Sequence, residues 1–317
     1  MLAAPAAFEL SDRRLVELPA RHRLESAVTA AFLARADAAE RLLAERGLPW
    51  RAARFLPGRT LLVVACQQFA DSPVGPYRQV SVSLPVHARF DRPEPPPPVP
   101  LLPLLAQALW RTERVFTDLH FYVAAIPVSE PAAVAYSHEI WGEPAWVAAV
   151  TARRGEGSLP GSPGAWWEVS VGHPGGENGE TFLRMAVKDG GLPFTERRGY
   201  RLVSRRGAAC LTDVMRVEAP ARLAFGPGRA VLEPGRSPRA AFLPDLAGRR
   251  PVAVQALVHG PGTVTFGGPC GSDGPPCGSD GPPGGSDGPP GGSGGPPGGS
   301  GGPPGGSGGP PGGGRRP

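Results

Sequence analysis

The sequence predicts an α+β fold that is mainly β, with a closed or sandwiched antiparallel sheet and a few packed helices. Many short apolar segments are separated by Gly- and Pro-rich turns, whereas only two or three segments have helical periodicity. The last 51 residues, 267–317, contain 24 glycines and 14 prolines in a heptapeptide-like repeat with Ser. Such a segment has too few apolar side chains to offset the entropy of ordering it. We therefore expect a folded domain over residues 1–266 and a disordered tail over residues 267–317.

Helical periodicity is clearest over Ala34–Gly47, where apolar residues share one face and a glycine follows the last turn. A second helix is predicted over Glu130–Gly142, since Pro131 suits a first turn and Gly142 suits a helix end. A shorter helix is expected over residues 104–113. The helices are expected to pack outside the sheet or across its mouth.

The strands are predicted from alternating apolar residues and flanking turns. Residues 59–69 and 78–88 form the first pair, joined across the Pro- and Gly-containing turn at 71–76. A proline run at 93–103 is expected to be a connecting loop. Further strands are predicted at residues 115–126, 145–151, 166–171, 181–187, 200–203, 208–218, 222–225 and 252–257.

Composition excludes several function classes. The formal net charge is +5 at pH 7, but the arginines are scattered as pairs, so we expect no nucleic-acid-binding surface. No apolar run approaches the roughly 18–20 residues of a membrane helix, and the first residues lack the features of a signal peptide. The histidines and cysteines lack metal-ligand spacing. We therefore expect a cytoplasmic protein with no membrane segment, metal or cofactor.

Two segments carry a family resemblance. Residues 72–86 contain Gly75-Pro-Tyr-Arg-Gln79 at the start of a strand, and residues 128–144 read VSEPAAVAYSHEIWGEP. Their order and spacing resemble the acetoacetate decarboxylase superfamily, in which a G-x-Y-x-E turn and strand precede a helix of the form EPA-x-A-x-x-x-E-L-x-G-x-P-K. The resemblance implies a β-cone or closed barrel with an internal cavity, and a homo-oligomer.

The resemblance also implies a chemistry that this chain lacks. Decarboxylases of the family form a Schiff base through the lysine that follows the helix, and that lysine is activated by a neighbouring cationic group. In this chain Ala145 stands there, and Lys188 is the single lysine of the sequence. Gln79 replaces the glutamate of the turn motif, Val64 corresponds to an acidic residue of the preceding strand, and Ala27 to an arginine. The sequence thus predicts a divergent member without the Schiff-base lysine.

The candidate functional residues are those at the matching positions. Glu139 and Lys188 are the weak catalytic candidates: Glu139 could act as a base or could hold the helix in place by pairing with an arginine, and Lys188 could equally be a solvated strand end. Candidate ligand-binding residues are Tyr77, Arg78, Gln79, His138, Glu139 and Trp141. A hydroxyl, a guanidinium that forks onto carboxylates and an aromatic wall suit a small-molecule pocket, although Tyr77 and Trp141 could also serve only as packing.

The function predicted from the sequence is an acetoacetate decarboxylase-like protein without decarboxylase activity. Its barrel pocket would bind a small organic acid or an apolar metabolite. The alternative is a carbon–carbon lyase, of the decarboxylase or the aldolase/dehydratase type, that acts on a small keto acid through Lys188 or without a lysine. A third hypothesis gives the Gly/Pro tail a role in assembly.

Overall fold

The computed structural model describes residues 6–87, 119–156, 164–174, 180–206 and 209–271. The predicted proline run at 93–103, the predicted helix at 104–113 and the tail from residue 272 onward lie outside these ranges. The described ranges all belong to one compact unit, Met1–Asp280.

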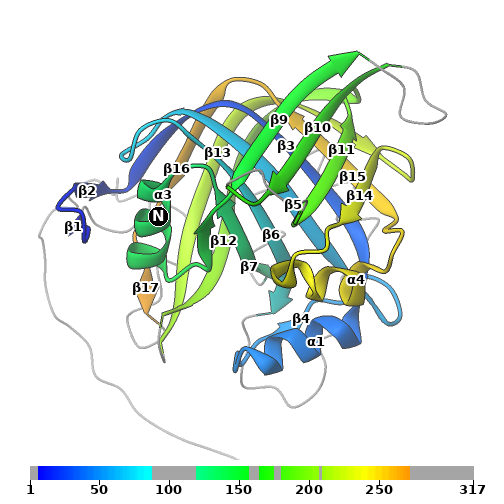
Figure 1. The fold of residues 1–317 in the computed structure, drawn as a ribbon, viewed down its shortest axis with the longest axis horizontal. Helices are drawn as coiled ribbons and strands as arrows, with labels where there is room; N and C mark the ends of the chain where they lie inside the picture. Colours follow the sequence, from blue (N-terminus) through cyan, green and yellow to red (C-terminus); the bar gives the residue numbers. More distant parts are fainter. Residues whose placement is uncertain (1–5, 88–118, 157–163, 175–179, 207–208, 272–317) are drawn as a thin grey trace, which may run out of the picture. The chain divides into compact units, whose positions relative to one another are not determined.

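The described part of the chain is rich in strands (Figure 1). In chain order the strands are β1 Ala6–Glu9, β2 Leu15–Leu18, β3 Ala20–Arg35, β4 Arg51–Ala52, β5 Arg59–Asp71, β6 Tyr77–His87, β7 Leu119–Val128, β8 Ala145–Val147, β9 Ala149–Glu156, β10 Ala165–Gly172, β11 Leu183–Lys188, β12 Leu192–Arg206, β13 Ala209–Phe225, β14 Ala230–Pro234, β15 Ala253–His259, β16 Gly262–Phe266 and β17 Cys270–Gly271.

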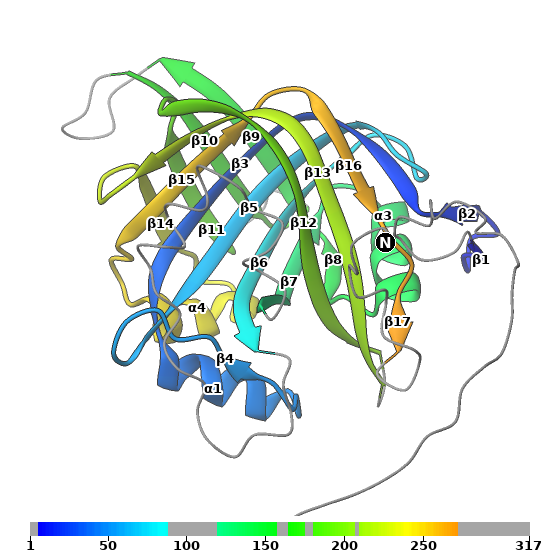
Figure 2. The same cartoon turned by 180° about the vertical axis from the view of Figure 1, so that it is seen from behind.

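The largest sheet closes on itself. Its strand order is β4-β6-β5-β3-β15-β13-β12-β7-β8, and β16 also bridges β3 and β13. The ring closes because β7 pairs with β12 in parallel and with β6 in antiparallel orientation. Figure 2 shows these long, tilted strands curving around a common interior. The predicted mainly β fold with a closed barrel is therefore confirmed.

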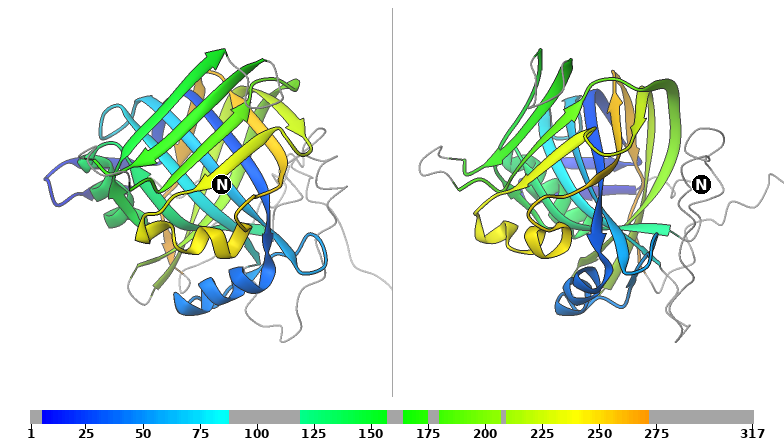
Figure 3. Two further views of the ribbon diagram at one scale, coloured as in Figure 1. Left: turned by 45° about the vertical axis from the view of Figure 1, so that its right-hand side comes forward. Right: turned by 90° about the vertical axis from the view of Figure 1, so that its right-hand side faces the viewer.

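A second sheet covers one outer face of the barrel. It has four strands in the order β14-β11-β10-β9, and it lies across β3, β5 and β6 (Figures 1 and 3). The helices α1 (Ala36–Glu45) and α4 (Phe242–Ala247) contact each other near the ends of these strands. Buried side chains of both sheets and both helices form one hydrophobic cluster. The barrel wall is therefore buried on both faces where the second sheet covers it.

Burial on both faces explains the composition of strand β6. Its side chains alternate across the sheet, as in any β-strand. Val80, Val82 and Leu84 belong to the outer hydrophobic cluster, whereas Gln79 and Ser83 line the interior. The sequence predicts this shared apolar face correctly, and the structure shows that the opposite, more polar face is the one that forms the cavity.

The predicted helix at Glu130–Gly142 forms as two pieces. An α-helix, α3, covers Pro131–Ala135, and a π-helical turn, η1, covers Tyr136–Ile140. Gly142 follows in the left-handed region with φ of 67°, which glycine adopts at no steric cost. A β-carbon at this position would also lie only 2.8 Å from the carbonyl oxygen of Arg205. The glycine thus permits the close approach that places the next residue, Glu143.

The structure extends three sequence predictions. The strands predicted at 208–218 and 222–225 are one continuous strand, β13, which passes through Pro220. Strand β12 is far longer than the predicted 200–203, because its polar residues alternate between the exposed face of a long hairpin with β13, as at Thr195 and Arg197, and the interior, as at Glu196. Residues Gly267 to Gly271, assigned to the tail from composition, continue the domain: Gly267 bonds to Val214, and β17 pairs with β13. Local composition could not reveal these partners.

Candidate ligand-binding cavity

The barrel encloses a cavity of about 180 Å³. Residues from eight of its strands and from the η1 segment line it, and along each strand the lining positions mostly alternate, as expected for one face of a pleated sheet. Most lining side chains are apolar. The polar ones are Thr29, Gln67, Tyr77, Gln79, Ser81, Ser83, Tyr136, Ser137, Glu143, Glu196, Arg198, Tyr200, Gln255 and His259.

Three of the predicted ligand-binding residues line this cavity: Tyr77, Gln79 and Trp141. Tyr77 and Gln79 begin β6, directly after the turn at 72–76, and Trp141 follows the π-helical turn. The indole nitrogen of Trp141 donates a hydrogen bond to the carbonyl oxygen of Gly267 at 3.3 Å. The two segments that carry the family resemblance therefore meet at one end of the cavity.

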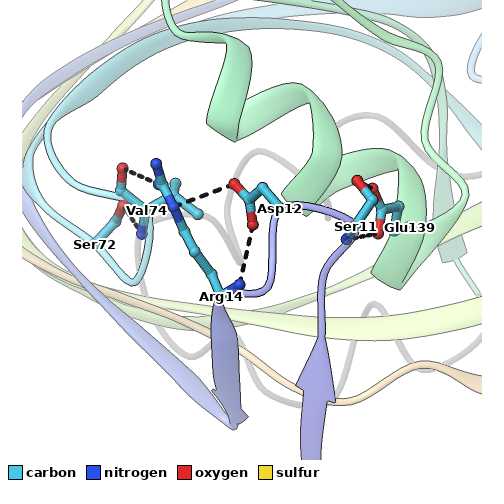
Figure 4. Close-up of polar contacts among 6 residues, drawn as sticks. All are labelled: Ser11, Asp12, Arg14, Ser72, Val74 and Glu139. Atoms are coloured by element: carbon cyan, nitrogen blue, oxygen red, sulfur yellow. Dashed lines mark hydrogen bonds and ion pairs between the residues drawn. The ribbon is translucent and has the colours of Figure 1, made fainter.

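The remaining predicted residues of these segments are not among the lining residues. Arg78 points to the opposite face of β6, where its Nε donates to Gln68, and His138 is exposed. Glu139 accepts hydrogen bonds from the backbone nitrogen and the hydroxyl of Ser11, at 2.8 and 2.5 Å. Figure 4 shows this contact between the η1 segment and the loop that joins β1 and β2. Glu139 thus anchors the N-terminal hairpin through Ser11, and not through the arginine expected for a structural role.

Lys188 lies in the outer four-stranded sheet. It ends β11, opposite Trp166 of β10, and its backbone nitrogen donates to the carbonyl oxygen of Arg229 at 2.9 Å. Its side chain is half-buried beside Gly164, where an added β-carbon would lie 3.7 Å from the lysine Cε. Lys188 is not among the residues that line the cavity.

Gln67 lies opposite Gln79, whereas Val64, which the sequence matches to an acidic residue of the family's preceding strand, faces the other side of β5. The two glutamines are paired in register on β5 and β6, and the amide of Gln79 donates to the side-chain oxygen of Gln67 at 2.5 Å. Val64 is fully buried in the outer hydrophobic cluster. The difference follows from strand alternation, because only every second residue of β5 faces the interior. The cavity lining therefore carries two neutral amides at this place.

A cluster of three uncharged aromatic side chains lies at the end of the cavity near η1. His22 is completely buried, and its Nε2 lies 2.8 Å from the hydroxyl of Tyr136, while its Nδ1 lies 3.5 Å from the hydroxyl of Tyr77. Burial lowers the pKa of His22 to about 3, and it raises the pKa of both tyrosines well above their usual value. All three groups are consequently uncharged at neutral pH.

Two carboxyl groups lie close to this aromatic cluster. Glu143 lines the cavity with only 8% of its surface exposed, and its carboxyl group makes no hydrogen bond or ion pair within the described ranges. Asp213 on β13 is also buried; its Oδ1 accepts from the backbone of Val214, while its Oδ2 has no partner in the described part of the chain. Burial raises the pKa of Glu143 to about 8, with a further contribution from the charge of Asp213, and burial raises the pKa of Asp213 to about 7.

A charged cluster forms another part of the lining. Glu196 is buried and accepts hydrogen bonds from Nε2 of His259 and from the hydroxyl of Tyr200, and its Oε1 lies 3.7 Å from Nε of Arg198. Burial raises the pKa of Glu196, but His259, Tyr200 and Arg198 together outweigh this effect, and its pKa lies below the usual value. The carboxylate is thus satisfied as an anion, since buried charges need such partners.

Sequence reasoning missed Glu143, Glu196, Arg198, Tyr200 and His259. Glu143 stands inside the matched segment, at the variable position before the final proline, so its place in the motif could have drawn attention to it. Glu196, Arg198 and Tyr200 recur at every second position, which could have marked one face of a strand. Their partner His259 lies 63 residues away from Glu196, so only the folded barrel brings them together.

The described ranges show neither a metal centre nor a membrane-spanning helix. No group of three or more His, Cys, Asp or Glu side chains there could hold a metal ion. No helix in this part of the chain has both the length and the apolar character needed to cross a membrane.

Comparison with known proteins identifies the fold. Neither a protein-family model nor a curated protein sequence matches the chain. Among solved structures, the enduracididine biosynthesis enzyme MppR, in complex with the condensation product of pyruvate and imidazole 4-carboxaldehyde, is 13% identical, with a TM-score of 0.50 over 85% of this chain and 97% of that chain. An acetoacetate decarboxylase is 11% identical, with a TM-score of 0.49 over 80% of this chain and 88% of that chain. The acetoacetate decarboxylase from Legionella pneumophila is 13% identical, with a TM-score of 0.47 over 80% of this chain and 87% of that chain. The likeness to MppR, at a TM-score of 0.50, shows that the chain shares the fold of that enzyme.

Proposed function

We propose that this domain binds a small, largely apolar organic molecule in its barrel cavity and does not decarboxylate keto acids through a Schiff base. One observation carries the proposal: the cavity is present, but the chain's single lysine is not among the residues that line it. Imine formation needs a primary amine next to the carbonyl of the substrate. Ala145, which follows the η1 segment, cannot supply one.

The lining favours an apolar body over a free organic acid. Most lining residues are hydrophobic, and Arg198 is the one arginine or lysine of the described lining. Its guanidinium faces the Glu196 carboxylate, which offsets its charge. A second carboxylate entering from solution would have to compete with Glu196 for the same cation and would also meet Glu143. Of the two ligand classes expected from the sequence, we therefore propose the apolar one.

Borohydride trapping tests the absence of Schiff-base chemistry. The full-length protein is incubated with acetoacetate or pyruvate, reduced and analysed by intact mass. We expect no adduct on the wild-type protein and none on Lys188→Arg. An adduct that Lys188→Arg abolishes would support the keto-acid lyase instead and would overturn the proposal.

Thermal denaturation tests ligand binding. A ligand that binds only the folded state stabilises it in proportion to ln(1 + [L]/Kd), and the melting temperature rises accordingly. We expect a panel of small apolar, cationic and anionic compounds to contain members that raise it, and Val123→Trp, which fills the cavity, to reduce the shift. Replacement of the exposed Glu168 by Gln serves as a control outside the cavity. A panel without any shift would contradict the binding proposal.

A further inference from the structure

At the end of the cavity near η1, carboxyl groups that lack a full set of partners lie close to aromatic rings. Glu143 faces the interior, its carboxyl group without a described hydrogen bond or ion pair, and Asp213 lies near enough for its charge to act on Glu143 and on Tyr136. A buried carboxyl without a partner is costly, and it is unusual in a native interior. Elsewhere in this barrel the chain does satisfy such a group, because Glu196 has three partners. A bound ligand could therefore provide the hydrogen bond or ion pair that the Glu143 carboxyl group lacks.

Aromatic rings surround the same position. Tyr77, Tyr136, Trp141 and Phe266 all line the cavity. The ring centroids of Tyr136 and Trp141 are 4.6 Å apart, and those of Trp141 and Phe266 are 5.7 Å apart. Tyr77 joins these rings through His22, whose ring centroid lies 6.0 Å from that of Tyr77 and 5.5 Å from that of Tyr136. The faces of such rings attract cations, most strongly where water is excluded. The two cation–ring contacts of the described residues lie elsewhere, at Phe194 and Trp146.

We infer that this end of the cavity binds the cationic group of a small alkylammonium compound, with Glu143 as its counter-ion and the four rings as its apolar walls. The inference rests on the proposed function, since it names the ligand class of the same cavity. An ammonium or quaternary ammonium group is complementary to both features of the site. Its positive charge would pair with the carboxylate, and its methyl or methylene groups would pack against the rings. The remainder of the ligand would extend along the apolar barrel interior.

A neutral ligand is the competing occupant. Protonated Glu143 could donate a hydrogen bond to a carbonyl or hydroxyl oxygen, as could a tyrosine hydroxyl. That alternative adds no positive charge near Oδ2 of Asp213, which has no partner in the described part of the chain, whereas a cation at Glu143 would also offset the charge of Asp213 that acts there. The rings favour the same choice, because a carbonyl oxygen has no attraction to their electron-rich faces. The two occupants differ in a measurable way: a cation displaces a proton from Glu143 when it binds, but a neutral ligand does not.

Calorimetric titration with two matched probes tests the inference. Choline and its uncharged carbon isostere 3,3-dimethylbutan-1-ol have nearly the same shape and differ mainly in charge. We expect choline to bind the wild-type protein at least about tenfold more tightly. We also expect its apparent binding enthalpy at pH 7 to change between buffers of different ionisation enthalpy, because protons are released. Glu143→Gln should lose this preference, whereas the exposed control Glu168→Gln should keep it.

Equal affinity of the two probes for the wild-type protein would overturn the inference, and this comparison needs no variant to fold. Retention of the choline preference in a folded Glu143→Gln protein would overturn it as well. If neither probe binds while other members of the thermal-denaturation panel do, the ammonium site is refuted and the proposed binding function stands. If no compound of any class binds, both are refuted.

Discussion

His22 and Tyr136 form a completely buried pair in which the imidazole Nε2 lies 2.8 Å from the phenol oxygen. The histidine comes from β3 and the tyrosine from the π-helical turn, 114 residues apart. The contact joins the barrel wall to the segment that carries Trp141 and Glu143. It therefore fixes one end of the cavity.

Replacement of His22 by Phe should lower stability and change its pH dependence. At pH 7 we expect a loss of about 1–3 kcal/mol, because the buried hydroxyl of Tyr136 loses its partner. The folded-state pKa of His22 is lowered to about 3, so the unfolded chain binds more protons between about pH 6.5 and pH 3. The wild-type protein should lose stability from this group as pH falls through that window. Urea denaturation across pH should show a smaller acid-side loss for the variant than for the wild type.

Replacement of Glu143 by Gln should change the folding stability at neutral to alkaline pH, and not at acidic pH as for His22. The folded-state pKa of Glu143 is raised to about 8, so the folded protein binds more protons than the unfolded chain above about pH 4.5. The stability contribution of the protonated group is complete below that pH and is lost as pH rises to about 8. We expect Glu143→Gln to be the more stable protein at pH 8 and to have a flatter profile. Asp213 has the same direction of shift, so a residual slope should remain. A variant whose slope between pH 5 and 8 equals that of the wild type would contradict the assignment.

Substitution of two adjacent arginines on β12 should have very different effects on the free energy of unfolding. Arg198 faces Glu196 inside the barrel, and Arg198→Met should cost about 3–5 kcal/mol, because a buried carboxylate loses its cation. Arg197 pairs with Glu218 on the outer surface, where both side chains are more than half exposed, and Arg197→Met should cost no more than about 1 kcal/mol. Denaturant unfolding measures both values. Similar costs for the two variants would show that the inward and outward faces of β12 are assigned wrongly.

Replacement of Gly142 by Ala should destabilise the protein by more than the cost of a left-handed backbone conformation alone. Gly142 and Gly58 have nearly the same φ, 67° and 66°, but a β-carbon at Gly58 meets nothing within 4 Å, whereas one at Gly142 meets Arg205 and Arg206 closely. Gly58→Ala should cost about 1–2 kcal/mol from conformation, and Gly142→Ala should cost more. The latter variant should also weaken ligand binding in the calorimetric assay, since Glu143 is displaced. Equal melting temperatures for the two variants would exclude the steric argument.

Two truncations test where the folded domain ends. A chain that stops at Gly271 keeps β17 and the carbonyl of Gly267, which accepts the hydrogen bond of Trp141. A chain that stops at Phe266 loses both. We expect the melting temperature of the first to equal that of the full-length protein and that of the second to be lower. Light scattering should give all three the same oligomeric state. A smaller oligomer for the truncated chains would support a role of the tail in assembly.

The sequence alone determined the local structure and the fold class. Alternation in β6, the glycine stop after α1 and the proline in the first turn of α3 depend only on neighbouring residues, so their elements could be predicted. The two motif segments indicated the fold and the place of Tyr77, Gln79 and Trp141. The absence of a lysine after the helix could also be read directly from the residues.

Only the tertiary structure decided which side chains line the cavity. Whether Glu139 or Glu143 faces inward depends on a π-helical turn and on Gly142, which rotate the chain by an amount that the sequence pattern does not show. Glu196 and His259 belong to distant strands whose registers are set by the closure of the barrel. Lys188 is excluded because its strand joined the outer sheet. Local residues choose strands and helices, but long-range pairing chooses which side of each strand meets the interior, and the polar groups of the cavity follow from that choice.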